Sequence, residues 1–83
     1  MKISDAQQGA LGLIRQKGCL YRKKLGRETG WCARGAPPVQ NQTIQALKKL
    51  GLVTEIEMVS RGFTHKAAVL TPAGREQVGV HRA

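Results

Sequence analysis

Aromatic side chains are scarce in this chain of 83 residues, which contains only Tyr21, Trp31 and Phe63. Leu, Val and Ile must therefore supply most of the hydrophobic core, and the one tryptophan is expected to pack inward. A chain of this length is near the lower limit for a self-sufficient core. We expect a single domain spanning residues 1–83.

Acidic residues are also few. The chain contains five Asp and Glu and fourteen Lys and Arg, which gives a formal net charge of +9. Such an excess says little about the fold but much about partners, and it favours polyanions: DNA, RNA or an acidic protein surface. A membrane surface is not favoured, because no segment combines a basic face with a large apolar face. The prediction is therefore a polyanionic partner and no membrane.

Long apolar runs and cysteine clusters are missing as well. No stretch approaches the roughly 18 apolar residues of a spanning helix, and the N-terminal residues contain no signal-peptide core, so we expect a cytoplasmic protein. Cys19 and Cys32 are the only cysteines, and His65 and His81 lie far from them. This spacing does not predict a zinc site, so two free thiols are expected, with a disulfide or a metal role as the alternative.

No enzyme motif is present. The five carboxylates form no paired motif, and the sequence has neither a phosphate-binding Walker loop nor a zinc-binding HExxH pattern. We therefore expect no catalytic residue, no metal and no cofactor.

The N-terminal segment predicts a helix over residues 4–17. Ser4 and Gln7 form a capping-box pattern, apolar residues then recur at helical spacing, and Gly18 is a natural stop. Gly9 and Gly12 each cost roughly 1 kcal/mol inside a helix. Our preferred interpretation is that they let another backbone approach, and the alternative is a helix-pair contact in a dimer.

Residues 19–38 are punctuated by Gly26, Gly30, Gly35 and the Pro37–Pro38 pair, which argue against the long helix that a standard helix-turn-helix would place here. We expect a short hairpin, with strands at 19–24 and 29–32, or an irregular segment.

Residues 39–50 predict a second helix. An extended approach is fixed by Pro37–Pro38, Ile44 and Leu47 mark an apolar face, and Gly51 ends the helix. Alternating residues over 52–70 predict a hairpin that turns at Arg61–Gly62. Thr71 and Pro72 then predict the start of a short helix over 72–78.

Two phrases carry a resemblance to a known family. The segment TIQALKKLGLV at 43–53 resembles the recognition-helix end of winged-helix regulators of the MarR and PadR type. LTPAGR at 70–75 is similar to the strand-to-helix junction after the wing of those proteins. The resemblance implies a small α+β winged helix-turn-helix domain, with 40–49 entering the major groove and 61–66 forming the wing. The helix that precedes the recognition helix in those families is replaced here by the segment rich in Gly and Pro.

The candidate site residues follow from side-chain chemistry and this placement. Asn and Gln can pair with the N6 and N7 atoms of adenine, which indicates base reading by Gln40, Asn41, Gln42 and Gln45. Cations suit phosphates, which indicates backbone contacts by Arg22, Lys23, Lys24, Arg27, Arg34, Lys48 and Lys49. The wing would contribute Arg61, His65 and Lys66, while Phe63 either belongs to the wing or caps the core below it.

The sequence therefore predicts a protein that binds double-stranded DNA, as a small transcriptional regulator. Its length is typical of proteins from phages and other mobile elements. The alternative is a winged-helix interaction module or small inhibitor that docks on an acidic, nucleic-acid-binding protein. RNA binding is a third interpretation, and a homodimer stays open.

Overall fold

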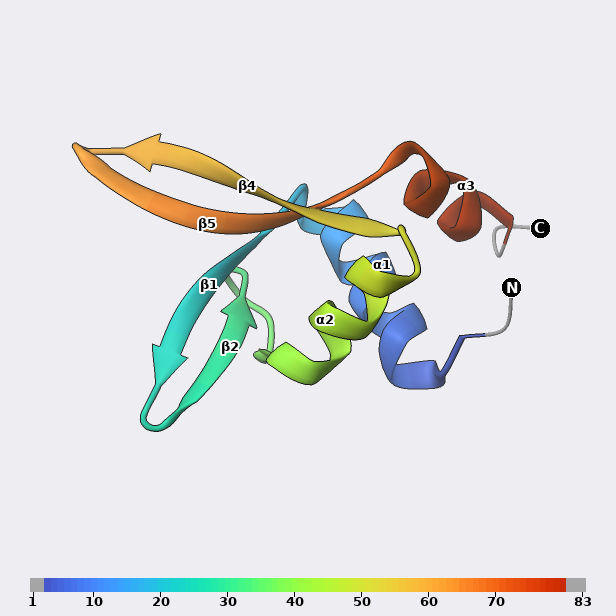
Figure 1. Ribbon diagram of the computed structural model, residues 1–83, viewed down its shortest axis with the longest axis horizontal. Helices are drawn as coiled ribbons and strands as arrows, with labels where there is room; N and C mark the ends of the chain where they lie inside the picture. Colours follow the sequence, from blue (N-terminus) through green and yellow to red (C-terminus); the bar gives the residue numbers. More distant parts are fainter. Residues whose placement is uncertain (1–2, 81–83) are drawn as a thin grey trace.

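The computed structural model describes residues 3–80 and has an α+β architecture with three helices and a five-stranded antiparallel sheet (Figure 1). The predicted α+β class is confirmed. Along the chain the elements are α1 (Asp5–Lys17), β1 (Leu20–Leu25), β2 (Glu28–Cys32), β3 (Val39–Gln40), α2 (Asn41–Lys49), β4 (Val53–Ser60), β5 (Phe63–Leu70) and α3 (Pro72–Val80).

The first helix forms as predicted. Ser4 is its N-cap, and both hydrogen bonds of the capping box with Gln7 are present. One face of α1 buries Ala10, Leu11 and Ile14 in the core, and the helix ends at Gly18.

The expected close approach of another backbone at the helical glycines is wrong, because a Cβ added at Gly9 or Gly12 would meet no atom within 4 Å. Within residues 3–80 no neighbouring backbone requires a glycine at either position.

Residues 19–32 form a hairpin, which is one of the two predicted forms of this segment. Strands β1 and β2 pair from Tyr21–Cys32 to Leu25–Glu28. Trp31 is 0% exposed, which confirms the inward packing expected for the single tryptophan. A bulky aromatic in the core fixes how this hairpin sits on the rest of the protein.

The predicted helix over 39–50 begins later than expected, because Val39 and Gln40 form β3. Val39 pairs with Trp31 and Gln40 pairs with Gly30, so the extended backbone set by Pro37–Pro38 adds a short edge strand before α2 starts. Gln40 is consequently the N-cap of α2 and not a residue of its first turn. Side-chain periodicity could not show this, since the pairing partner lies on β2.

The end of α2 is set by Gly51, whose φ of 76° lies in the left-handed region. The amide of Gly51 donates to the carbonyl of Lys48, and the amide of Leu52 donates to that of Leu47. This is the Schellman arrangement, which favours glycine because a side chain would be strained there. The chain reversal at Gly51 directs β4 back across the helix.

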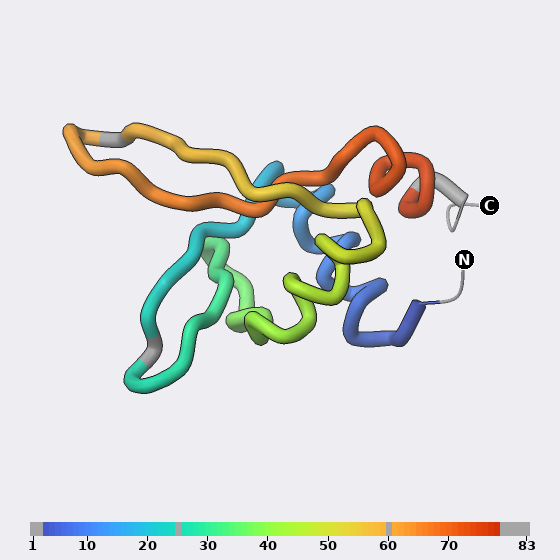
Figure 2. Tube along the Cα trace, viewed as in Figure 1, coloured from blue at the N-terminus to red at the C-terminus, as the bar shows by residue number. Residues whose placement is uncertain are grey.

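Strands β4 and β5 form a long hairpin with a two-residue turn at Arg61–Gly62, as the sequence predicted. Its distal half projects away from the helices (Figures 1 and 2). Near the tip, Val59 is 75% and Phe63 is 68% exposed. The alternative that Phe63 caps the core is therefore wrong, because Phe63 pairs with Ser60 at the far end of the hairpin.

The C-terminal helix starts at the predicted cap and extends to Val80, beyond the predicted end at residue 78. The Thr71 hydroxyl accepts from the amide of Gly74 at 3.0 Å and donates to the carbonyl of Gly51 at 2.6 Å. Thr71 thus caps α3 and ties it to the turn that follows α2.

The strand order β3–β2–β1–β5–β4 joins the two hairpins through β1 and β5 in one sheet. The junction is short, consisting of the pairs Leu20–Ala68 and Tyr21–Ala67. Around it the core gathers residues from the helices and the strands, the largest being Trp31, Leu11, Ile14, Leu20, Ile44, Leu47 and Leu52. Beyond the junction the two hairpins extend away from the core and diverge from each other (Figures 1 and 2).

We expect Gly74→Ala to lower the free energy of unfolding by about 1–3 kcal/mol, as overpacking does. A Cβ at Gly74 would collide with the backbone carbonyl oxygen of Leu52 and lie 3.0 Å from its carbonyl carbon. Gly9→Ala is the matched control, because its Cβ would enter open space and alanine favours the helix by roughly 0.5–1 kcal/mol. Urea denaturation of both variants checks the expectation, and equal effects at the two sites would contradict it.

Candidate nucleic-acid interface

The exposed stripe of α2 consists of Gln42, Gln45 and Lys49, which follow one another at helical spacing. The opposite face is fixed in the core by Ile44 and Leu47. The first turn of α2 contains no acidic residue, and its last turn carries Lys48 and Lys49. The helix therefore presents amides and a cation to solvent, with no carboxylate of its own that would repel phosphate.

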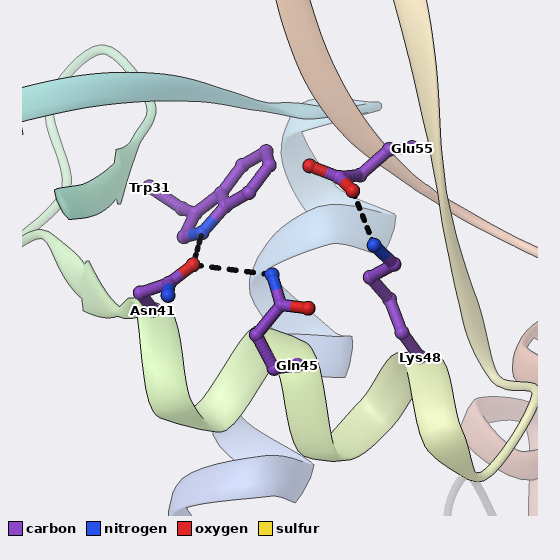
Figure 3. A network of polar contacts seen from close by, with 5 residues as sticks. All are labelled: Trp31, Asn41, Gln45, Lys48 and Glu55. Carbon is purple, nitrogen blue, oxygen red and sulfur yellow. Dashed lines mark hydrogen bonds and ion pairs between the residues drawn. The ribbon is translucent and has the colours of Figure 1, made fainter.

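Asn41, one of the predicted base-reading residues, makes hydrogen bonds inside the protein (Figure 3). Its Oδ1 accepts from the indole Nε1 of Trp31 at 2.9 Å and from Nε2 of Gln45 at 3.2 Å. A carbonyl oxygen has two lone pairs, and both are used here. Pairing with adenine through both amide atoms would cost Asn41 one of these bonds. Its main contribution is to fasten α2 to β2 and satisfy a buried indole.

Lys48, a predicted phosphate contact, forms an ion pair with Glu55 of β4 (Figure 3). The hydrogen bond from Lys48 lowers the pKa of Glu55, and burial raises that pKa by a smaller amount. The charges of Lys66 and Arg22 lower it further. Lys48 thus links the end of α2 to the sheet. Among the cations of α2, Lys49 is the more exposed and is left as the better phosphate contact.

The divergence of the two hairpins creates a fork, which we define as the space between β1 and β5 beyond the pair Tyr21–Ala67. Because side chains alternate along a strand, the strand register assigns each cation to one side of the sheet. On the side that α2 packs against, marked by Trp31 and Glu55, the cations of the fork are Arg22, Lys24 and Lys66. On the outer side, marked by Tyr21, lie the cation Lys23 and the imidazole of His65.

The α2 side of the fork is hollowed. A cavity of about 360 Å³ is lined by Arg22, Lys24, Thr29, Thr64, His65 and Lys66. A neighbouring cavity of about 320 Å³ is lined by Glu28, Thr29, Gln40, Asn41 and Gln42. Thr29 borders both, so the cations of the fork and the amides at the start of α2 belong to one continuous surface. Glu28 is the acidic residue among these lining residues, and Glu57, opposite Lys66 in the strand register, also faces the α2 side.

The remaining predicted contacts are spread around this surface. Arg27 lies at the turn of the β1–β2 hairpin, and Arg61 lies at the turn of the β4–β5 hairpin. Arg34 and Lys23 line a third cavity, on the outer side of the fork. The cations that appear as one run in the sequence are thus divided between two sides of the sheet.

Sequence reasoning missed Thr29 and placed Thr64 only within the wing segment; the two residues line the fork from β2 and β5. They lie 35 positions apart, and only the pairing of β1 with β5 brings their strands together. No local signal could have identified them.

Within residues 3–80 no helix is long and apolar enough to cross a membrane. In the same part of the chain, no group of three or more His, Cys, Asp and Glu side chains is placed to hold a metal ion.

Comparison of the chain with known protein families, with curated proteins and with solved structures found no match. The functional assignment therefore rests on the residues and their geometry.

Proposed function

We propose that this protein binds double-stranded DNA as a small transcriptional regulator, with α2 in the major groove. The observation that carries the proposal is the continuous surface on which the amides of α2 meet the cations of the fork. An α-helix fits the major groove, where amide side chains can distinguish bases. The cations of the fork, together with Lys49 on the helix, would hold it on the phosphates.

The arrangement of elements supports a winged-helix interpretation. The order α2, β4, β5 and α3 is that of a recognition helix followed by a wing and a further helix. In this interpretation β4–β5 is the wing, with Arg61 at its tip and Lys66 nearer its base. The β1–β2 hairpin takes the position of the helix that precedes the recognition helix in winged-helix regulators, and it supplies a second basic arm.

The roles of individual residues follow from their exposure. Gln42 and Gln45 are the exposed amides of α2 and would read base edges. The phosphate contacts on the same surface would be Arg22, Lys24, Lys49 and Lys66, extended at the two hairpin turns by Arg27 and Arg61. Asn41 would act by holding α2 in position, through Trp31.

We expect Gln45→Ala to weaken binding to the preferred duplex by roughly 1–3 kcal/mol and to leave binding to random duplex nearly unchanged. The amide would read a base and would contribute little to phosphate binding. The preferred duplex is obtained by selection from a random-sequence pool, and affinities are measured by fluorescence anisotropy. Gln16→Ala is the matched control, because Gln16 is an exposed glutamine on α1.

Lys24→Ala is the contrasting variant in the same measurement. Loss of a phosphate contact should weaken binding to all duplexes alike. If no sequence is enriched, or if Gln45→Ala weakens specific and random duplex equally, α2 does not read the major groove.

A second candidate is favoured by the tip of the β4–β5 hairpin, where Val59 and Phe63 are exposed on opposite faces, close to the turn that contains Arg61. Apolar residues next to a cation suit an acidic protein surface with an apolar centre. In that case the protein would be a docking module or small inhibitor. Failure of the duplex selection, together with loss of partner binding in Phe63→Ala, would favour this candidate.

A further inference from the structure

The outer side of the fork contains a cavity that shares only Arg22 with the proposed duplex contacts. It has a volume of about 620 Å³ and is lined by Tyr21, Arg22, Lys23, Cys32, Ala33, Arg34 and His65. This volume is within the range of about 300–1,000 Å³ that is typical of small-molecule sites. Arg22 and His65 border both this cavity and the one on the α2 side, so the two hollows adjoin at these residues. By the strand register, Tyr21 and Lys23 face the outer side, whereas Lys24 and Thr29 face the α2 side.

An aromatic pair forms one wall of the outer cavity. The rings of Tyr21 and His65 meet edge to face, with centroids 6.4 Å apart and an interplanar angle of 78°. Tyr21 is 43% exposed, so part of its ring is open to a ligand. The phenol of Tyr21 is neutral at physiological pH by its ordinary pKa, and a side-chain hydrogen bond with Cys19 raises that pKa further. A neutral ring does not repel an anionic ligand.

The other walls are cationic and apolar. Arg22 and Lys23 come from β1, and Arg34 comes from the turn after β2, where Gly35 has a φ of 78°. Cys32 and Ala33 contribute a small apolar surface to the lining. None of the described residues that line this cavity carries a carboxylate. The cavity therefore combines a partly open aromatic ring, an apolar floor and three permanent cations.

We propose that the outer cavity binds an unpaired nucleotide of single-stranded nucleic acid, with its base stacked on Tyr21 and its phosphates on Arg22, Lys23 and Arg34. Aromatic stacking beside a cationic groove is how proteins bind single strands without sequence preference. A duplex would not fill this site, because the faces of its bases are covered by their neighbours. An acidic peptide would satisfy the cations but would leave the aromatic ring without a matching partner.

This site is independent of base reading by α2. Gln42 and Gln45 lie on the other side of the sheet from Tyr21, Lys23 and Arg34. A protein with both sites would hold a duplex on one side of the fork and an adjoining single strand on the other.

The test is anisotropy titration of the full chain with a labelled oligothymidylate of on the order of ten nucleotides. Tyr21→Ala should weaken this binding about 10-fold, as loss of one stacking contact does, whereas Tyr21→Phe should retain it. Phe63→Ala is the matched control, because Phe63 is an exposed aromatic outside the cavity. Arg34→Ala is an independent variant, since Arg34 is exposed on a turn, and it should lower the salt slope by about one.

Several outcomes would overturn the proposal. Equal losses in Tyr21→Ala and Phe63→Ala would show that stacking in the cavity is not involved, and so would unchanged binding in both Tyr21→Ala and Arg34→Ala. Thymidine monophosphate that competes as well as the oligonucleotide would identify a free nucleotide, and not a strand, as the ligand. Tyr21→Ala should leave duplex selection intact and Gln45→Ala should leave oligothymidylate binding intact, so the two proposals fail separately.

Discussion

Trp31→Ala should lower the free energy of unfolding by about 3–5 kcal/mol, which is the cost of truncating a fully buried tryptophan. Trp31 is 0% exposed and is the largest residue of the core. Its loss would leave a cavity where β2 meets α2, and it would also remove the indole donor to Asn41. Small domains have total stabilities of only about 5–15 kcal/mol. The variant should therefore unfold at a clearly lower urea concentration than the unaltered protein.

Urea denaturation followed by circular dichroism measures this effect. Phe63→Ala is the matched control, because Phe63 is 68% exposed and its truncation should change stability by less than about 0.5 kcal/mol. A Trp31→Ala variant that unfolds at the same urea concentration as the unaltered protein would contradict the described core.

Elements with local causes could be predicted from the sequence. The capping box at Ser4 and the Thr71–Pro72 start each depend on residues within one turn, and the structure contains both. The turn at Arg61–Gly62 is equally local, because it joins two alternating segments. The α+β class followed from these elements taken together.

Features that depend on distant partners could not be predicted. The two-residue strand at Val39–Gln40 exists because β2 lies beside it, and nothing within those residues indicates a strand. The fork likewise depends on the pairing of Leu20 with Ala68.

The exposure of the candidate site residues could be predicted better than their hydrogen bonds within the protein. Amides at the start of α2 were expected to face a ligand, and Gln42 and Gln45 are exposed. Asn41 has the same chemistry, but it bonds to the indole of Trp31, which only the packed structure places beside it. Lys48 is drawn to Glu55 for the same reason. Side-chain chemistry indicates what a residue can bind, and the packed neighbours decide what it does bind.

Duplex DNA binding should depend steeply on salt. The cations available on the α2 surface are Arg22, Lys24, Lys49 and Lys66, with Arg27 and Arg61 at the hairpin turns. If roughly five phosphates are neutralised, log K should fall against log salt with a slope near −4 to −5. Between about 50 and 200 mM salt, the affinity should then fall roughly 300- to 1,000-fold.

Two variants relate this slope to the proposed surface. Lys24→Ala should reduce its magnitude by about one, because one phosphate contact is lost. Arg75→Ala is the matched control, since Arg75 is an exposed cation on α3 that lies outside the fork, and it should leave the slope unchanged.

The most direct test of duplex binding is therefore a titration of random-sequence duplex DNA at several salt concentrations, followed by fluorescence anisotropy. We expect measurable binding at low salt and a slope of log K against log salt near −4 to −5. The magnitude of this slope should be smaller for Lys24→Ala than for Arg75→Ala. No binding at low salt, or an affinity that stays constant as salt rises, would contradict the proposal that the fork and α2 form a DNA-binding surface.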